Sequence, residues 1–413
     1  TAIGYQAAVL LTSGASNTVV GFGALDAADA SENNNVAIGV DAMGACDQGS
    51  DASADIEFNV AIGNDALKGG AFGSANLNLT NNVAIGYQAM DGTATIGGNN
   101  CVFVGGDAGG GSWTGTESNF NVGIGHGSMD GAMNGSSSNT AVGYRGLSAI
   151  TTGAANVGIG KDAGLVLDTG GTNTFIGVSA GDGTDDGSNN VAVGYLALSA
   201  NCVDTNTAVG VEALIACTGG TNTAVGSAAG YSVTSGANNT FLGFQSGISG
   251  SPGGAQSTGD NKIFLGDENI TNFHAQVVLS AASDKRDKTD VKELDLGLEF
   301  INKLLPVTYK WDKRSKYIDK HDPTVDLNEV VTDGTHKEDW IDVGFLAQDV
   351  ADIESSYDYK IKEKTNLTTS LSDDGKQYST QYSKFVPMLV KSIQELSQKV
   401  DEQSKRIEEL ESK

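Results

Sequence analysis

The chain has 413 residues, a formal net charge of −26 at pH 7 and 56 glycines. Such an acidic surface repels phosphate backbones and anionic lipid headgroups, so the composition argues against nucleic acid and membrane surfaces as partners. No stretch of 18 apolar residues occurs, so no membrane-inserted helix is expected.

The composition divides the chain at about residue 283. Before this point lie 52 of the 56 glycines, with 23 acidic and 4 basic residues, whereas 28 acidic and 21 basic residues follow it. We therefore expect a repetitive first part over residues 1–270, a connecting strand over 271–282, an α+β domain over 283–380 and a C-terminal helix over 381–413.

A short phrase that ends in glycine recurs along the first part, as in Asn35-Val-Ala-Ile-Gly39. Its fifteen glycines stand at positions 4, 21, 39, 63, 86, 105, 125, 143, 160, 177, 194, 210, 226, 243 and 266. Most steps are 16 to 20 residues, too short for a helical pair and suitable for one turn of a β-solenoid. A β-sandwich with Asn and Gly in its turns is the alternative, but it does not account for the recurrence of the whole phrase.

Each repeat predicts one short strand between two corners. Asn, four positions before the glycine, suits a corner because it tolerates left-handed backbone angles. Val, Thr, Ile or Phe at positions −3 and −1 share one face and are expected to form a tight apolar surface, with Ala at −2 on the opposite side. The glycine permits the next corner. A small residue at +3 and Leu or Met at +4 are expected to point inward.

Cysteines and histidines predict neither a disulfide framework nor a metal site. The four cysteines (Cys46, Cys101, Cys202 and Cys217) lack CxxC spacing and are interpreted as small buried residues in a reducing compartment. The four histidines form no cluster, and the acidic loop 181–187 lacks the spacing of a known calcium motif. We therefore expect no metal and no cofactor.

The repeated phrase resembles the head repeat of trimeric autotransporter adhesins, and this resemblance covers residues 1–270. It implies a parallel β-roll in which three chains associate. Longer steps predict loops near 44–58, 68–81 and 248–260, and a glycine-rich excursion at 109–117 contains Trp113. Loops on a rigid scaffold often carry binding specificity. We consider Trp113 a weak receptor-binding candidate that could stack on a sugar, and packing against a neighbouring chain is the alternative.

Four ordered motifs mark the remaining chain, at residues 283–288, 297–311, 343–350 and 382–396. Together they resemble the endosialidase-type C-terminal intramolecular chaperone of phage tail fibres and tailspikes. The resemblance spans residues 283–413 and implies a domain that trimerises, nucleates folding of the β-rich part before it and usually cuts itself off.

The family's nucleophile position falls on Ser283 and its lysine on Lys288, so the resemblance implies a scissile bond between Ala282 and Ser283. A desolvated lysine can remove the proton of a serine hydroxyl, which is the chemistry of a Ser–Lys dyad. At most a single-turnover autoproteolysis is expected, with no multiple-turnover activity. The alternative is that Ser283-Asp284 caps a short helix and that Lys288 is an ordinary surface charge.

The C-terminal segment carries a heptad-like apolar seam with charges outside it. The seam consists of Tyr382, Val386, Leu389, Ile393, Leu396, Val400, Gln403, Ile407 and Leu410. Its residue types nominally favour a coiled coil of two helices, whereas the resemblance favours three. We expect a trimeric coiled coil.

Together these features predict a mainly β protein: a trimeric parallel β-roll or β-solenoid shaft, then an α+β chaperone domain that ends in a coiled-coil helix. The predicted function is that of a homotrimeric phage tail fibre, located in the virion and assembled in the host cytoplasm. It would bind a host cell-surface glycan or protein, and other tail proteins through a segment before Thr1, since the chain begins inside a repeat. Alternatives are a bacterial trimeric surface adhesin or a tailspike that degrades host glycans, although the repeats show no recurring carboxylate pair.

Overall fold

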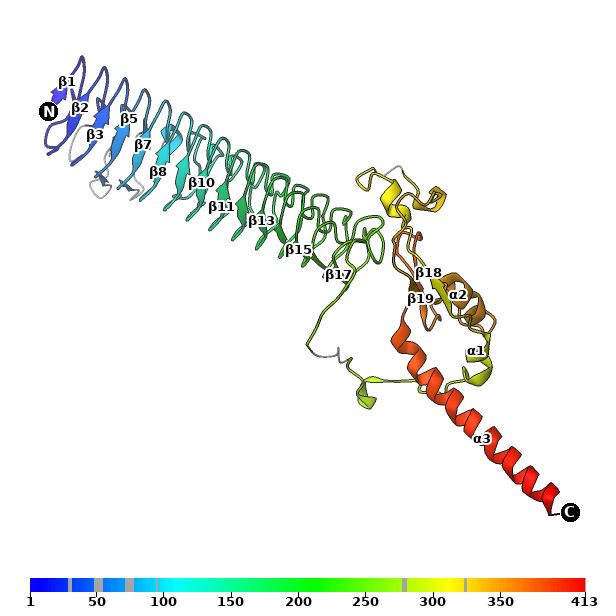
Figure 1. Ribbon diagram of the computed structural model, residues 1–413. Coiled ribbons are helices and arrows are strands. Elements are labelled where there is room, and N and C mark those ends of the chain that lie inside the picture. Colours follow the sequence, from blue (N-terminus) through cyan, green and yellow to red (C-terminus); the bar gives the residue numbers. More distant parts are fainter. Residues whose placement is uncertain are drawn as a thin grey trace. The chain divides into compact units, whose positions relative to one another are not determined.

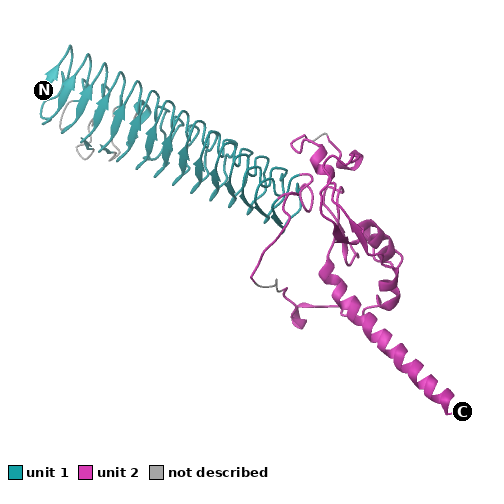
Figure 2. Cartoon of the chain, in the orientation of Figure 1, with its two compact units in different colours: residues 1–248, 256–266 teal, residues 249–255, 267–413 magenta. Residues whose placement is uncertain are grey.

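The computed structural model describes residues 1–28, 32–47, 55–70, 78–93, 96–276, 281–322 and 325–412. The chain forms two compact units: residues 1–248 with 256–266, and residues 249–255 with 267–413 (Figure 2). The first is a parallel β-solenoid and the second contains the helices, which confirms the predicted mainly β class with a C-terminal helix. No helix within the described part of the chain is long and apolar enough to cross a membrane.

The first unit stacks its coils so that each contributes a strand to one long sheet (Figure 1). Among the described residues this sheet has 15 strands, ordered along the chain and paired in parallel. They are β1 (Ala2–Ile3), β2 (Thr18–Val20), β3 (Val36–Ile38), β5 (Val60–Ile62), β7 (Val83–Ile85), β8 (Val102–Val104), β9 (Val122–Ile124), β10 (Thr140–Val142), β11 (Val157–Ile159), β12 (Thr174–Ile176), β13 (Val191–Val193), β14 (Thr207–Val209), β15 (Thr223–Val225), β16 (Thr240–Leu242) and β17 (Ile263–Leu265). A second parallel pair joins β4 (Ile56–Glu57) to β6 (Leu79–Thr80).

The solenoid core lies on the face of the strands opposite to the one that the sequence predicted. Position −2, in the middle of each strand, is buried, as at Ala37 and Phe175. Positions −3 and −1 are half-buried or exposed, so their assignment to the tight inward face is wrong. The residues at +3 and +4, such as Ala66 and Leu67, are buried as predicted. The interior is narrow, which explains why small residues dominate at −2 and +3.

The recurring asparagine forms an internal ladder instead of a left-handed corner. The backbone amide of Asn190 donates to the side-chain oxygen of Asn173 in the preceding coil, at 2.8 Å, and Asn173 is itself buried. The left-handed angle falls one residue earlier, as at Thr172 with φ of 58° and Asn189 with φ of 60°. The corner was therefore predicted in the right place but assigned to the wrong residue.

The repeat glycine is required by both angle and space. Gly160 has φ of +136°, and a Cβ atom there would lie 2.4 Å from the carbonyl oxygen of Gly177 in the next coil. The same relation recurs from coil to coil, as between Gly177 and Gly194. Any side chain at this position would push neighbouring coils apart, so the glycine allows the close stacking of the solenoid.

The second unit has its own core around three helices, with Leu296, Phe300, Val350, Phe385 and Met388 buried together. Its helices and strands are α1 (Leu298–Lys303), β18 (Val307–Tyr309), β19 (Asp342–Gly344), α2 (Ala347–Ser355), β20 (Thr369–Leu371), β21 (Tyr378–Thr380) and α3 (Phe385–Glu411). Short 3-10 turns are η1 (Asp91–Thr93) in the first unit, and η2 (Lys285–Asp287), η3 (Arg314–Tyr317), η4 (Leu327–Glu329), η5 (Ile361–Glu363) and η6 (Tyr382–Lys384) in the second. The pairs β18–β19 and β20–β21 are antiparallel.

Helix α3 uses one side of its first turns for the core of the unit and leaves the predicted seam exposed. Phe385, Met388 and Ser392 are buried, and the carboxylate of Glu395 accepts a 2.8 Å hydrogen bond from the backbone amide of Leu298 at the start of α1. Val386, Leu389, Ile393, Leu396, Val400, Ile407 and Leu410 are exposed. Tyr382 precedes the helix, in η6.

Candidate self-cleavage site

Ser283 and Lys288 lie next to each other at the start of the second unit's continuous segment. The Nζ atom of Lys288 donates to the Oγ atom of Ser283 at 2.6 Å. The two residues are five positions apart, and the 3-10 turn η2 between them folds the backbone back so that the side chains meet. The predicted base and the predicted nucleophile are therefore in direct contact.

The turn η2 is fixed by Asp284. This residue is the N-cap, and its Oδ1 atom accepts a hydrogen bond from the backbone amide of Arg286 at 2.9 Å. The guanidinium of Arg286 also donates to the same carboxylate, through Nε at 3.1 Å and Nη2 at 2.6 Å. These bonds hold the pKa of Asp284 below its usual range. Capping was the alternative to the dyad, and in the structure Asp284 caps the turn while Lys288 contacts Ser283.

The site is open to water in a single chain. All residues from 281 to 293 are exposed, including Ser283 and Lys288. A general base must carry no proton, and water solvates the charged form of an exposed lysine well. The predicted connecting strand over 271–282 is not formed at residues 271–276 or 281–282, and 277–280 lie outside the described residues.

The model of the family described as chaperone of endosialidase matches residues 283–359. This segment is an endosialidase-type chaperone. The match begins at Ser283, immediately after the predicted scissile bond. Neither a curated protein nor a solved structure matches the chain. A chaperone of this family that follows a β-solenoid indicates a protein of the phage tail-fibre or tailspike type.

Trp113, the weak receptor-binding candidate, is buried and does not offer an exposed aromatic ring. Its side chain is only 2% exposed and packs edge-on against Phe103, with ring centroids 6.0 Å apart. Its Nε1 atom donates to the carbonyl oxygen of Gly109 at 3.1 Å. The expectation of an exposed ring is wrong because the glycine-rich excursion folds the indole into the solenoid core. Packing against a neighbouring chain was the expected alternative, and the contacts that the structure shows are with Phe103 and Gly109 of the same chain.

The other sequence predictions concern the four cysteines and the three long loops. The four cysteines are free and buried. Parts of the predicted loops 44–58 and 68–81, residues 48–54 and 71–77, lie outside the described residues. The loop predicted at 248–260 contains residues 249–255, which group with the second unit and not with the solenoid. The sequence held no signal for this grouping, because it depends on contacts with residues that lie far along the chain.

Proposed function

We propose that the chain is the subunit of a homotrimeric phage tail fibre whose chaperone assembles three copies and then cuts the bond between Ala282 and Ser283. The contact of 2.6 Å between Lys288 Nζ and Ser283 Oγ, at the first residues of the chaperone match, carries this proposal. The fibre would belong to the virion and assemble in the host cytoplasm. Its solenoid would present the host-binding surface, and the fibre would also bind other tail proteins.

The proposed cleavage is an acyl shift followed by hydrolysis. Neutral Lys288 takes the hydroxyl proton of Ser283, and the Oγ atom attacks the carbonyl carbon of Ala282. The peptide C–N bond breaks, and the proton passes from the lysine to the Ser283 nitrogen, leaving an ester between Ala282 and the serine oxygen. Water then hydrolyses the ester, which yields the Ala282 carboxylate and a free Ser283 with its amino group and hydroxyl. No cofactor is needed.

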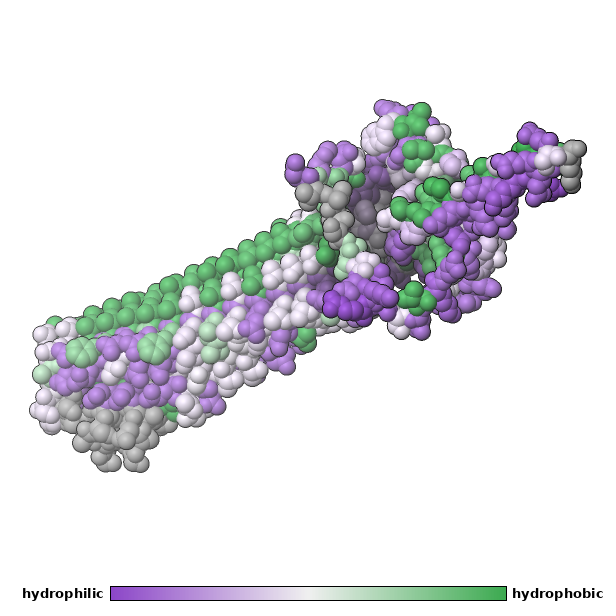
Figure 3. Space-filling view, turned by 90° about the horizontal axis from the view of Figure 1, so that it is seen from below, coloured by the Kyte–Doolittle hydropathy of each residue, from purple (hydrophilic) through white to green (hydrophobic). Residues whose placement is uncertain are grey.

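Two exposed apolar surfaces support association with further copies. The first is the seam of α3 described above. The second runs along the solenoid, where Figure 3 shows a hydrophobic band, and its residues alternate with the buried ones along each strand. Exposed members at −1 and +1 include Tyr5, Phe22, Ile85, Tyr87, Ile124, Tyr144, Ile159, Ile176, Tyr195, Leu242 and Phe244. Contiguous exposed apolar surface of this extent is typical of an interaction site.

Self-association would also cover Lys288, which is exposed to water in a single chain. The base has to lose its proton, and a neighbouring copy that covers residues 281–293 would favour the neutral lysine. Cleavage would then follow assembly, since an unassembled chain keeps its lysine in water. This order would retain the chaperone until the three solenoids have been brought into register.

Mass spectrometry of the purified wild type beside Ser283→Ala and Lys288→Gln tests the proposal. We expect the wild type to yield fragments that end at Ala282 and begin at Ser283, and both variants to remain at full length. Asp287→Asn, a neighbouring exposed residue, is the matched control and should cut like the wild type. A wild type that stays intact after assembly would refute the self-cleavage, and analytical ultracentrifugation of Ser283→Ala would separately test for three copies.

A further inference from the structure

Two segments that precede the scissile bond belong to the same compact unit as the chaperone. They are residues 249–255 and 267–272, which we call the anchor segments (magenta in Figure 2). They contact residues 313–320 and 372–377, which we call the docking segments and which follow the bond. Contacts between these two sets therefore join parts of the chain that would become separate polypeptides after cleavage.

A buried ion pair is the strongest of these contacts. The carboxylate of Glu268, in an anchor segment, pairs with the ammonium of Lys320, and the side chains are only 6% and 11% exposed. The backbone carbonyl of Glu268 also accepts a hydrogen bond of 2.6 Å from Lys313 Nζ, and Lys313 pairs in turn with Glu338 at 3.1 Å. Removing one partner of a buried charge pair is costly, because the other charge is left without water or counter-charge.

The loop 249–255 makes a second set of contacts. The backbone amide of Ala255 donates to Asp374 Oδ2 at 3.1 Å, and Gln377 Nε2 donates to the carbonyl oxygen of Gly250 at 3.4 Å. The backbone of this loop lies very close to Ser315. A Cβ atom at Gly250, where φ is +88°, would lie 2.2 Å from the Cβ atom of Ser315. The loop is therefore fitted to the docking segments at the level of the backbone.

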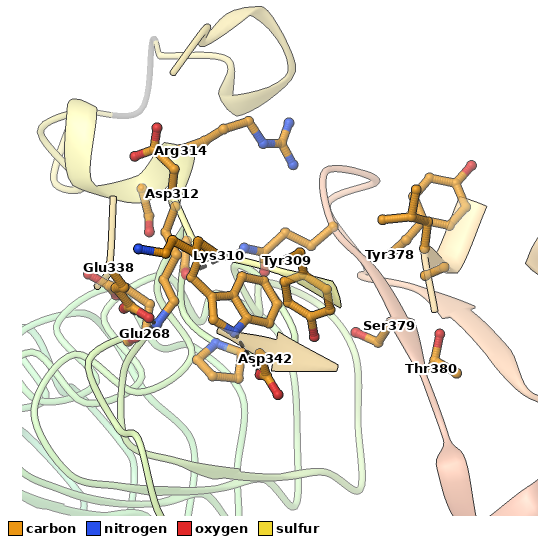
Figure 4. Close-up of a pocket in the computed structure, with 18 of the residues that line it drawn as sticks. Glu268, Tyr309, Lys310, Asp312, Arg314, Glu338, Asp342, Tyr378, Ser379 and Thr380 are labelled. Carbon is orange, nitrogen blue, oxygen red and sulfur yellow. Dashed lines mark hydrogen bonds and ion pairs between the residues drawn. The ribbon is translucent and has the colours of Figure 1, made fainter. Parts of the chain in front are cut away.

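Both sets of residues also share one cavity. Its volume is about 1170 Å³, and its walls include Gly250 and Glu268 before the bond as well as Trp311, Ser315 and Gln377 after it. In Figure 4, Glu268 lies beside Glu338 on one side of the pocket, and Tyr378, Ser379 and Thr380 form the other. The scissile residues, Ala282 and Ser283, are exposed and do not line this cavity.

We propose that the chaperone remains bound to the fragment 1–282 after cleavage, held by the anchor segments, so that cutting and release are separate steps. This inference rests on the proposed self-cleavage. Cutting the exposed bond between Ala282 and Ser283 removes none of the contacts described above. The buried pair of Glu268 and Lys320 has to separate before the chaperone can leave. The partner of the anchor segments is thus the chaperone fragment itself, and release is the slow step.

An engineered cut tests retention independently of the natural one. A recognition site for a sequence-specific protease is inserted between positions 282 and 283 of the Ser283→Ala chain, and the purified protein is cut and passed over a size-exclusion column. We expect the two fragments to co-elute. Glu268→Gln should speed their separation by roughly 30-fold, the usual effect of truncating one partner of a buried charge pair. Fragments of the parent chain that separate on cutting would overturn the proposal.

The control and a second variant keep the result interpretable. Glu293→Gln makes the same chemical change in an ion pair, with Lys391 at 3.0 Å, whose two partners both lie after the bond, and it should leave co-elution unchanged. Gly250→Ala alters the loop outside the solenoid coils and should also accelerate separation. If both Glu268→Gln and Gly250→Ala fold but separate no faster than the parent, the anchor segments do not hold the chaperone. A wild type that never cuts itself would refute the self-cleavage alone.

Discussion

The backbone amide of Asn173 donates a 2.9 Å hydrogen bond to the side-chain oxygen of Asn156, one coil earlier. The side-chain nitrogen of Asn173 reaches the same oxygen at 3.1 Å and the carbonyl oxygen of Gly187, in the following coil, at 2.8 Å. One amide side chain thus connects three successive coils inside the solenoid. Because buried polar groups need hydrogen-bond partners, removing one asparagine of the ladder leaves groups in the neighbouring coils without theirs.

Asn173→Ala should therefore destabilise the solenoid. The change leaves the backbone amide of Asn190 without its acceptor and the carbonyl of Gly187 without its donor, at an expected cost of roughly 1–3 kcal/mol. Thermal unfolding followed by circular dichroism measures the loss as a lower midpoint. Asn64→Ala, at an exposed position of the same solenoid, is the control and should change the midpoint little. Equal midpoints for the two variants would contradict a structural role for the ladder.

Gly160→Ala should be more damaging than the loss of one ladder amide. The added methyl group would lie 2.4 Å from the carbonyl oxygen of Gly177, on a backbone with φ of +136°, so both sterics and strain oppose it. We expect a loss of more than about 3 kcal/mol in the free energy of unfolding, or failure to fold. Gly146→Ala is the matched control, because its new Cβ atom would have no neighbour closer than 3.4 Å. Urea titration of both variants gives the comparison.

The stability of the solenoid should depend on pH through Asp91. Burial and, to a smaller extent, the charges of Asp107, Asp65 and Asp130 together raise the pKa of this carboxyl to about 6. An ordinary aspartate in the unfolded chain titrates near ~3.9, so between these values the folded chain binds more protons. This contribution therefore favours folding at low pH and is lost as the pH rises through about 6.

Asp91→Asn should remove that dependence. The variant should be more stable than the parent at pH 7, and the difference should shrink as the pH falls toward 4. Urea unfolding at a series of pH values measures the difference between the two proteins, so that other titrating groups cancel. Parallel pH profiles for parent and variant would show that Asp91 does not titrate in this way.

Ile393→Glu should weaken association of the chains. Ile393 is 66% exposed on the seam of α3, and a charge there would be buried if the seam forms a coiled coil. We expect association at least about tenfold weaker, seen by sedimentation velocity as smaller species at low concentration. Gln394→Glu places the same charge next to the seam and should leave the sedimentation profile unchanged. Identical profiles for both variants would exclude the seam from the interface.

The period of the solenoid could be predicted from sequence, whereas the direction of its core could not. Alternation along a strand of three residues shows that Val36 and Ile38 share a face and that Ala37 faces the other way, but it does not say which face is inside. The signal lies in compensation between coils: Phe103 stands beside Gly123, where a Cβ atom would come within 2.6 Å of the phenyl ring. A large side chain at position −2 of one coil beside a glycine at position −2 of the next indicates that both positions face the same narrow core.

The candidate site was predictable in part for a similar reason. The family resemblance carried by the four motifs pointed to Ser283 and Lys288, and one local turn brings the two side chains together. The contact between Asp284 and Arg286, which holds that turn, is also local. An Asp at the N-cap position is the sequence feature that could have predicted it. The contact between Glu268 and Lys320 had no such signal, because it joins residues 52 positions apart through the folding of the unit.

Because the coils are joined in series along the solenoid axis, a pulling force acts on every junction equally, and the weakest one yields first. The asparagine ladder passes through nearly all of them. At Cys101 the ladder position lacks a side-chain amide: its backbone amide donates a 2.9 Å hydrogen bond to the side-chain oxygen of Asn82, but its thiol offers no carbonyl oxygen to the next coil. A solenoid pulled from both ends should therefore open first between the coil of Cys101 and the coil of Asn121. This junction is the expected point of mechanical failure.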